Sequence, residues 1–275
     1  MRGVAGSPRR LSGPVAAVAL VLGSAPLVVG APEVDPVDLW QKSLAAQRFP
    51  DLQADATLTT TFPSGDTVTL HVKLLAVVPA GGTGRMAITR VTSGGPLLGS
   101  TFLNIERSQG TDDLWVYLPA VATPRRLVSS NLADSYLGSE FRYGDLVQPD
   151  PADYAVTLRG EETVEGEPCW VLEVVPREPR LVRNTGLGRE VLWLRRQNLV
   201  ERKVEQYDRH VALLKVLDVP RLFTDPASGK VFAVERRIRN VQSGVVSTAS
   251  FENVEVNRGL GTEPFSPARL SDRSW

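Results

Sequence analysis

Hydrophobic and polar positions alternate every two residues along much of the chain beyond residue 50. Between residues 67 and 77, for example, valine and leucine at even positions alternate with Thr69, His71 and Lys73. This is the pattern of a β-strand with one face in water. Turn sequences such as Pro63-Ser-Gly-Asp66 separate such segments. About eleven strands, without strand–helix–strand alternation, predict a mainly β fold built on one antiparallel sheet that is strongly curved or partly closed.

The strand predicted at residues 113–118 is apolar on both faces. Leu114 and Val116 point to one side, whereas Trp115 and Tyr117 point to the other, because side chains alternate along a strand. An antiparallel strand exposed to water on one side would have polar residues at every second position. We therefore expect each face to be covered, by protein, by a bound apolar ligand, or by one of each.

One segment has helical periodicity. Asp35 is a good N-cap, Pro36 suits the first helical position, and Val37, Trp40 and Leu44 recur at helical spacing. We expect a short amphipathic helix that either packs on the core or forms a lid with Trp40 as its plug. Two other segments have no regular pattern: we expect residues 180–189 to form an exposed loop and residues 259–275 to lie loosely over the surface.

The amino-terminal 31 residues have the organisation of a secretory signal peptide. Three arginines precede an apolar run at residues 15–22, and small residues follow at Gly30-Ala31. The run is too short for a membrane-spanning helix of about 20 residues, and a retained anchor is the alternative. We expect cleavage near Gly30-Ala31, after export by the general or the twin-arginine route. Residues 32–275 would then form a single exported domain.

Composition argues against several classes of function. Without residues 1–31, the chain has 28 basic and 31 acidic residues, so it lacks the basic field that nucleic-acid binding requires. The single cysteine, Cys169, excludes an internal disulfide and a cysteine-rich zinc site. Neither His71 nor His210 has a second histidine or a cysteine at ligand spacing. We therefore expect no metal site and no cofactor.

The sequence contains no assembled catalytic set. Ser139 follows Gly138 but lacks the second glycine of a nucleophile elbow. The glycines at residues 94–95 lack the following Lys-Ser/Thr of a phosphate-binding loop. We predict that the protein is not an enzyme. The remaining alternative is an envelope hydrolase that uses Ser139 or Ser100.

Several motifs occur in order over most of residues 36–257. They are Asp113-Leu-Trp-Val-Tyr-Leu-Pro119, Pro124-Arg-Arg-Leu-Val128, Ser135-Tyr-Leu-Gly-Ser-Glu-Phe141 and the segment Val164–Pro176. In these motifs the chain resembles the broad branch of the LolA-like outer-membrane lipoprotein-sorting protein family. The resemblance implies an unclosed antiparallel β-barrel with a helical lid and an apolar cavity for acyl chains, with no cofactor and no catalytic residues. Because Arg125 and Arg126 form a pair, a single functional arginine cannot be assigned to either.

The pattern and the resemblance together predict a periplasmic carrier. It would bind lipid or the acyl chains of lipoproteins in an apolar cavity and transfer them towards the outer membrane. The candidate lipid-binding residues are Trp40 and Leu44 on the helix, and Leu103, Trp115, Tyr117, Leu172 and Trp193 on strands. The expected protein partners are an inner-membrane transporter or an outer-membrane acceptor. The alternative is an envelope lipid or lipoprotein sensor that regulates a membrane protein partner.

Overall fold

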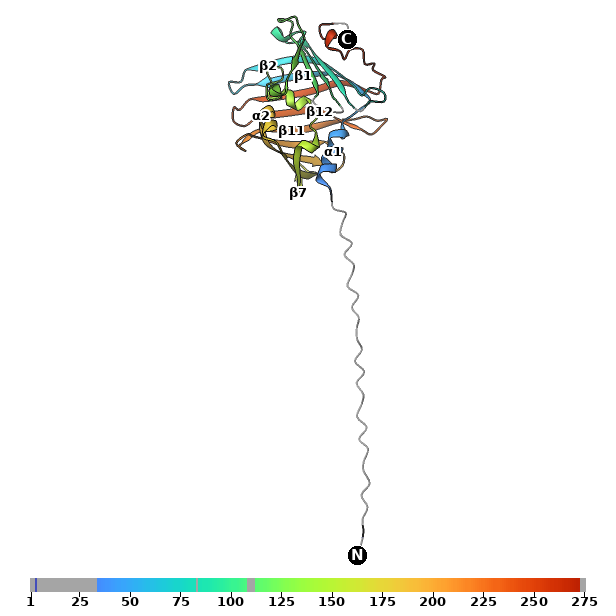
Figure 1. The fold of residues 1–275 in the computed structure, drawn as a ribbon, viewed down its shortest axis with the longest axis vertical. Coiled ribbons are helices and arrows are strands. Elements are labelled where there is room, and N and C mark those ends of the chain that lie inside the picture. The colour runs from blue at the N-terminus through green and yellow to red at the C-terminus, as the bar shows by residue number, and fades with distance from the viewer. Residues whose placement is uncertain (1–2, 4–33, 83, 108–111, 273–275) are drawn as a thin grey trace. The chain divides into compact units, whose positions relative to one another are not determined.

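One antiparallel sheet of thirteen strands forms the framework of the described chain in the computed structural model (Figure 1). The structure describes residues 3, 34–82, 84–107 and 112–272. The predicted signal peptide therefore lies outside the described residues, apart from residue 3. The strand order is β6-β5-β4-β3-β2-β1-β13-β12-β11-β10-β9-β8-β7. The predicted unclosed antiparallel sheet is confirmed, with thirteen strands in place of about eleven.

The elements have the following bounds. The strands are β1 (Asp51–Thr61), β2 (Thr67–Val77), β3 (Met86–Ser93), β4 (Thr101–Ile105), β5 (Asp113–Tyr117), β6 (Arg125–Leu127), β7 (Tyr154–Val164), β8 (Glu167–Pro176), β9 (Leu187–Arg195), β10 (Glu201–Asp208), β11 (Leu213–Thr224), β12 (Val231–Asn240) and β13 (Val246–Val256). The helices are α1 (Pro36–Ala46) and α2 (Pro179–Thr185), with short 3₁₀ turns η1 (Gly95–Leu97), η2 (Ser129–Asn131), η3 (Tyr143–Leu146), η4 (Pro151–Asp153) and η5 (Pro267–Arg269).

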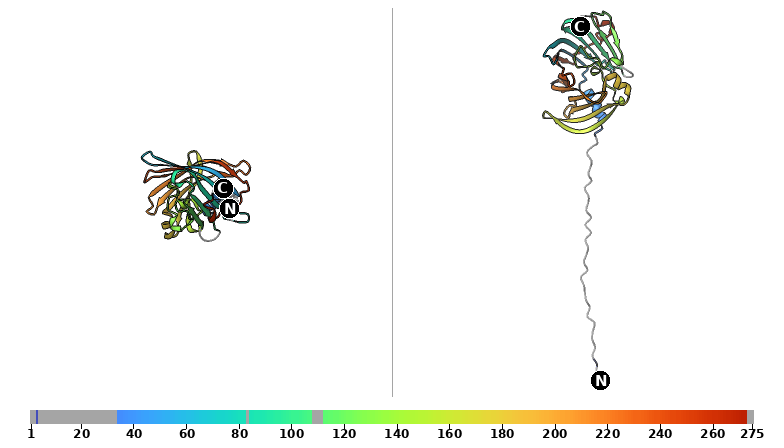
Figure 2. Two further views of the ribbon diagram at one scale, coloured as in Figure 1. Left: turned by 90° about the horizontal axis from the view of Figure 1, so that it is seen from above. Right: turned by 90° about the vertical axis from the view of Figure 1, so that its left-hand side faces the viewer.

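The sheet curls without closing, and its two edge strands follow one another in the chain. These edges are β6 and β7, and the segment that joins them, residues 128–153, packs inside the curve (Figure 2). We call this segment the inner loop. Its Tyr136 hydroxyl bonds Thr89 of β3 at 2.6 Å, while its Glu140 reaches strands β11 to β13. One loop can contact strands so far apart in the order only from the concave side of the sheet.

Polar side chains of the sheet hold the inner loop in place. The Glu140 carboxylate accepts a hydrogen bond from Asn240 at 3.1 Å and lies 2.8 Å from the Lys215 ammonium. The backbone N–H of Glu140 donates to the Ser247 hydroxyl at 3.0 Å. Lys215 is only 8% exposed, and the Glu140 carboxylate offsets the cost of burying its ammonium group. Residues 135–141, one of the motifs in which the chain resembles the LolA-like family, therefore dock the inner loop on the sheet.

The carboxyl-terminal segment covers part of the convex face. Asp51 accepts two backbone N–H groups where the segment begins. Farther along, Phe265 and Leu270, which are 4% and 0% exposed, pack against Leu103. The expectation that this segment lies loosely over the surface is therefore wrong. Two large apolar side chains are enough to dock a segment that is otherwise rich in proline, serine and glycine.

Both apolar faces of β5 are covered by protein. Leu114 packs with Tyr136 of the inner loop on the concave side. Trp115 and Tyr117 pack with Phe265 of the carboxyl-terminal segment on the convex side. The sequence left open whether protein or a bound apolar ligand covers each face, and in the structure protein covers both.

Residues 179–185 form helix α2, although an exposed loop was expected there. Proline occupies the first helical position, and Gly186 ends the helix with φ 74°, a left-handed conformation that glycine adopts without strain. Strand β9 starts directly afterwards at Leu187. The prediction was wrong because a helix of 7 residues is too short to establish a hydrophobic period.

Candidate functional site

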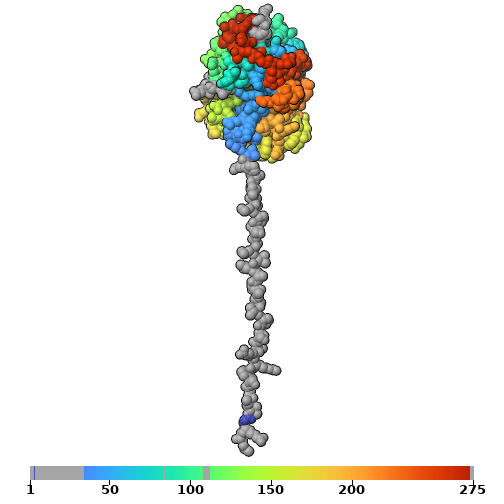
Figure 3. Space-filling view, turned by 90° about the vertical axis from the view of Figure 1, so that its right-hand side faces the viewer, coloured from blue at the N-terminus to red at the C-terminus, as the bar shows by residue number. Residues whose placement is uncertain are grey.

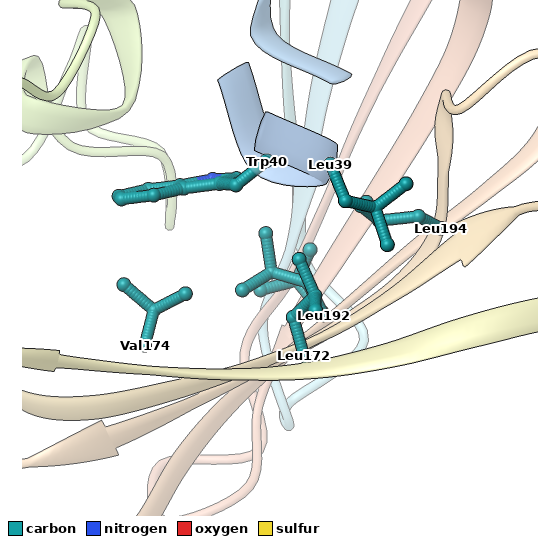
Figure 4. Packing of buried hydrophobic residues seen from close by; sticks show 7 residues of the cluster. Leu39, Trp40, Leu172, Val174, Leu192 and Leu194 are labelled. Carbon is teal, nitrogen blue, oxygen red and sulfur yellow. The ribbon is translucent and has the colours of Figure 1, made fainter. Parts of the chain in front are cut away.

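Helix α1 covers an apolar surface on the concave side of β8, β9 and β10 (Figure 4). Five buried side chains, which we call the apolar floor, form this surface: Leu172, Val174, Leu192, Leu194 and Val204. Leu39 and Trp40 of the helix pack on the floor and are 6% and 3% exposed. The Trp40 ring meets Tyr154 edge-on at 5.3 Å between centroids. The helix therefore occupies the space over the floor that the resemblance would give to an acyl chain.

Apolar contacts and one end anchor hold α1 to the sheet. Within the described chain, residues 36–46 make no hydrogen bond to a strand, and the buried Ser43 hydroxyl has no partner. The anchor is Gln47 at the C-cap, whose side-chain oxygen accepts from Ala233 N at 2.8 Å and from Arg236 at 3.3 Å. Figure 3 shows α1, in blue, at the molecular surface. A swing about the Gln47 end would thus break few hydrogen bonds while exposing the floor.

The structure divides the seven predicted lipid-binding residues between the two faces of the sheet. Three of them, Trp40, Leu44 and Leu172, meet at the apolar floor. The other four, Leu103, Trp115, Tyr117 and Trp193, lie on the convex side. The structure therefore brings only the first three together.

Strand register explains the division. In the pairing of β8 with β9, Leu172 lies opposite Leu192 and Val171 lies opposite Trp193, so Leu172 and Trp193 point to opposite faces. The Trp193 indole N–H donates to Glu162 at 2.8 Å, and Lys203 lies 4.3 Å from the ring centroid. The sequence shows which residues share a face of one strand. It does not show which face becomes concave.

A cavity of about 180 Å³ lies beside the C-terminal end of α1. Its lining comprises Leu44, Gln47, Arg48, Arg85, Glu106, residues 145–149, Phe232 and Arg236. Pockets for drug-sized ligands measure about 300–1,000 Å³, so this cavity is too small for an acyl chain while α1 stays in place. The resemblance implied an apolar cavity, whereas the lining of this one is strongly charged.

Three arginines and one glutamate dominate the electrostatics of the cavity. Arg48 forms an ion pair with Glu106 at 2.5 Å. Arg236 donates to the neutral side chain of Gln47. Arg85 is partly buried, and burial lowers the pKa of its guanidinium, with Arg48 and Arg236 adding to the effect and Glu106 opposing it. Positive side chains therefore outnumber negative ones in the lining of the cavity.

Buried polar groups of the inner loop were missed by reasoning from the sequence. Arg142 is buried and forms an ion pair with Asp145. Gln206 of β10 donates to Asp145 at 3.4 Å and to Glu190 of β9 at 3.1 Å. Burial raises the pKa of Glu190 and Asp145 adds to that rise, although Arg142 opposes it. The available signal was a polar residue on an otherwise apolar face of a strand, such as Lys215 between Leu213 and Leu217.

Asp112 should make stability depend on pH. Burial, with a contribution from Glu106, raises its pKa to about 6, and its Oδ2 is buried without a hydrogen-bond partner among the described residues. Because the folded-state pKa lies above the unfolded value, ionisation destabilises the fold above about pH 6, and the cost disappears as the pH falls to about 4. We expect Asp112→Asn to stabilise the protein at pH 8 by about 1–2 kcal/mol after allowance for solvent screening. The gain should vanish near pH 4.

Urea unfolding of wild type and variant between pH 4 and 8 measures this gain. The neighbouring Asp113 supplies a control of opposite sign. Burial alone would raise its pKa, but hydrogen bonds and ion pairs with Arg107 and Arg126 lower it. Asp113→Asn should therefore destabilise the protein at pH 8. A stabilisation by Asp112→Asn that is equal at all pH values would contradict the assignment.

Within the described ranges, no group of three or more His, Cys, Asp or Glu side chains is arranged to hold a metal ion. Cys169 is buried, and burial raises its pKa, which disfavours the reactive thiolate. Ser139 donates to the carbonyl of Tyr136 at 2.6 Å and so stabilises a turn of the inner loop. None of the described helices is long and apolar enough to cross a bilayer.

Comparison with known proteins identifies the family. A family model described only as an uncharacterized protein matches residues 84–272. No curated protein matches the chain. A domain from Vibrio parahaemolyticus, assigned to outer membrane lipoprotein sorting, shares 26% identity and a TM-score of 0.78, over 86% of this chain and 98% of that one.

Two further solved structures share the fold. A DUF1329 family protein from Desulfovibrio piger has 24% identity and a TM-score of 0.78, over 86% of this chain and 100% of that one. A LolA superfamily protein from Nitrosomonas europaea has 22% identity and a TM-score of 0.64, over 85% of this chain and 98% of that one. The chain therefore belongs to the matched family, and it has the LolA-like fold of the outer-membrane lipoprotein-sorting proteins.

Proposed function

We propose that the protein is a periplasmic carrier that binds the acyl chain of a lipid or lipoprotein on the apolar floor beneath α1. The cargo is transferred towards the outer membrane without chemical change. The similarity to a domain assigned to outer membrane lipoprotein sorting supports this function, and so does the export signal expected at residues 1–31. The protein needs no catalytic group for such a role.

One observation carries the proposal: within the described residues, a short helix and no second sheet covers the apolar floor. Leu172 and Leu194 are both 0% exposed, and Leu39 and Trp40 of α1 complete their burial. An acyl chain could replace the helix with little loss of apolar burial, since each buried methylene contributes about 0.8 kcal/mol. The closed conformation then represents the empty carrier, in which α1 occupies the site of its cargo.

Lipid that co-purifies with the protein tests this function. The protein should be extracted from the cell envelope without detergent and analysed by native mass spectrometry. We expect a fraction of the wild type to retain one lipid, and Leu192→Asn in the floor to retain much less. Val191→Asn, the adjacent change on the opposite face of β9, serves as the matched control and should retain lipid. A wild type free of lipid, or equal retention by both variants, would contradict the proposal.

A further inference from the structure

The cavity beside α1 contains more positive than negative charge. Three guanidinium groups line it, from Arg48, Arg85 and Arg236. Of the two carboxylates in the lining, Asp145 already forms an ion pair with Arg142 within the inner loop, and Glu106 pairs with Arg48. Arg85 and Arg236 therefore line the cavity without a carboxylate partner among the described residues.

The described residues do not satisfy the hydrogen-bonding capacity of either arginine. The Arg85 guanidinium makes no hydrogen bond or ion pair with a described residue, and the described hydrogen bond of Arg236 goes to the neutral Gln47 amide at 3.3 Å. Residues 83 and 108–111, the undescribed neighbours of the cavity lining in sequence, contain no Asp or Glu. Glu106 is shared with the ion pair to Arg48, so the positive charges of the partly buried Arg85 and Arg236 are incompletely compensated, which favours the binding of an anion.

We propose that Arg85 and Arg236 bind the anionic headgroup, a phosphate or a carboxylate, of the lipid whose chain lies on the apolar floor. Leu44 joins the two regions, because it lines the cavity and also packs at the floor. The volume of about 180 Å³ is far above the about 10–15 Å³ that one water needs, and a guanidinium matches the geometry of both oxyanions. The lipid part of this inference rests on the proposed function.

Calorimetric titration with three probes tests the inference. The probes are dodecyl phosphate, its neutral counterpart glycerol monolaurate, and inorganic phosphate. We expect Arg85→Gln and Arg236→Gln each to weaken dodecyl phosphate binding about tenfold, the usual size of a charged hydrogen bond, and to leave glycerol monolaurate binding unchanged. Arg237→Gln is the matched control, since Arg237 is exposed on the opposite side of β12 and should change neither affinity.

The outcomes separate the anion site from lipid binding. Equal binding of the two amphiphiles, unaffected by the arginine variants, would overturn the anion site and leave the carrier function intact. If neither amphiphile binds, the carrier function fails. In that case, arginine-dependent binding of inorganic phosphate would support an anion site for free phosphate. An absence of phosphate binding would overturn the anion site as well.

A second measurement does not depend on any ligand. Arg85 is partly buried, and burial with the neighbouring arginines disfavours its charge more than Glu106 favours it, so removal of that charge should stabilise the empty protein. We therefore expect Arg85→Gln to raise the unfolding temperature in phosphate-free buffer. A lower unfolding temperature would show that Arg85 is satisfied within the protein, and would overturn its assignment to an anion.

Discussion

Replacing Trp40 by alanine should increase the affinity of the protein for a long-chain fatty acid by about tenfold or more. Trp40 is 3% exposed and holds α1 closed over the apolar floor. Truncation of a buried tryptophan costs about 3–5 kcal/mol, and here most of that loss falls on the closed conformation. A larger fraction of the protein is then in the open conformation, so a ligand that binds only this conformation binds with higher apparent affinity. The expected rise is smaller than the full cost because the remainder of that cost falls on the open conformation.

Displacement of a fluorescent fatty acid measures this effect. The control is Trp193→Ala, which removes an equally large side chain from the convex face of β9 and should leave the affinity within about twofold of wild type. Both variants should first be shown to unfold cooperatively. Weaker binding by Trp40→Ala would mean that this residue forms part of the site without closing it, and the lid assignment would be wrong.

Replacing Leu270 by alanine should lower the free energy of unfolding by about 2–5 kcal/mol. Leu270 is 0% exposed and fixes the carboxyl-terminal segment on the convex face. Its removal leaves a void beside Leu103 and Trp115 and loosens the cover over β5. Urea unfolding measures the loss, and Thr262→Ala, at an exposed position of the same segment, should change stability by less than about 0.5 kcal/mol.

The same variant distinguishes the two faces of the sheet functionally. Because Leu270 packs on the convex side, Leu270→Ala should leave the affinity for fatty acid unchanged under conditions where the protein is folded. A large loss of affinity in the folded variant would indicate that the convex cluster around Trp115 is the lipid site. That result would favour the interpretation of Trp115 and Tyr117 drawn from the sequence alone.

Local patterns in the sequence were sufficient to predict the architecture. Alternation at residues 67–77 identifies a strand whatever its neighbours, and Asp35-Pro36 followed by Trp40 identifies the start of α1. The antiparallel order follows because short turns join consecutive strands. These features depend only on residues close together in the chain.

The placement of the site could not be predicted in the same way. Whether Leu172 or Trp193 faces the interior depends on the direction in which the whole sheet curves, and no single strand encodes that direction. The cavity joins Arg48, Arg85 and Arg236, which are distant in sequence and have no motif in common. Glu140 finds Lys215 only after the inner loop enters the curve of the sheet. Such long-range pairings are visible only in three dimensions.

Photo-crosslinking of a fatty acid tests the central claim most directly. A palmitic acid analogue with a diazirine near the end of its chain should be irradiated with the protein, and the labelled peptides should be identified by mass spectrometry. The account predicts labels on the concave side of β8 and β9, at Leu172, Val174, Leu192 or Leu194, that unlabelled palmitic acid suppresses. Suppressible labels confined to the convex cluster around Trp115, or none at all, would contradict it.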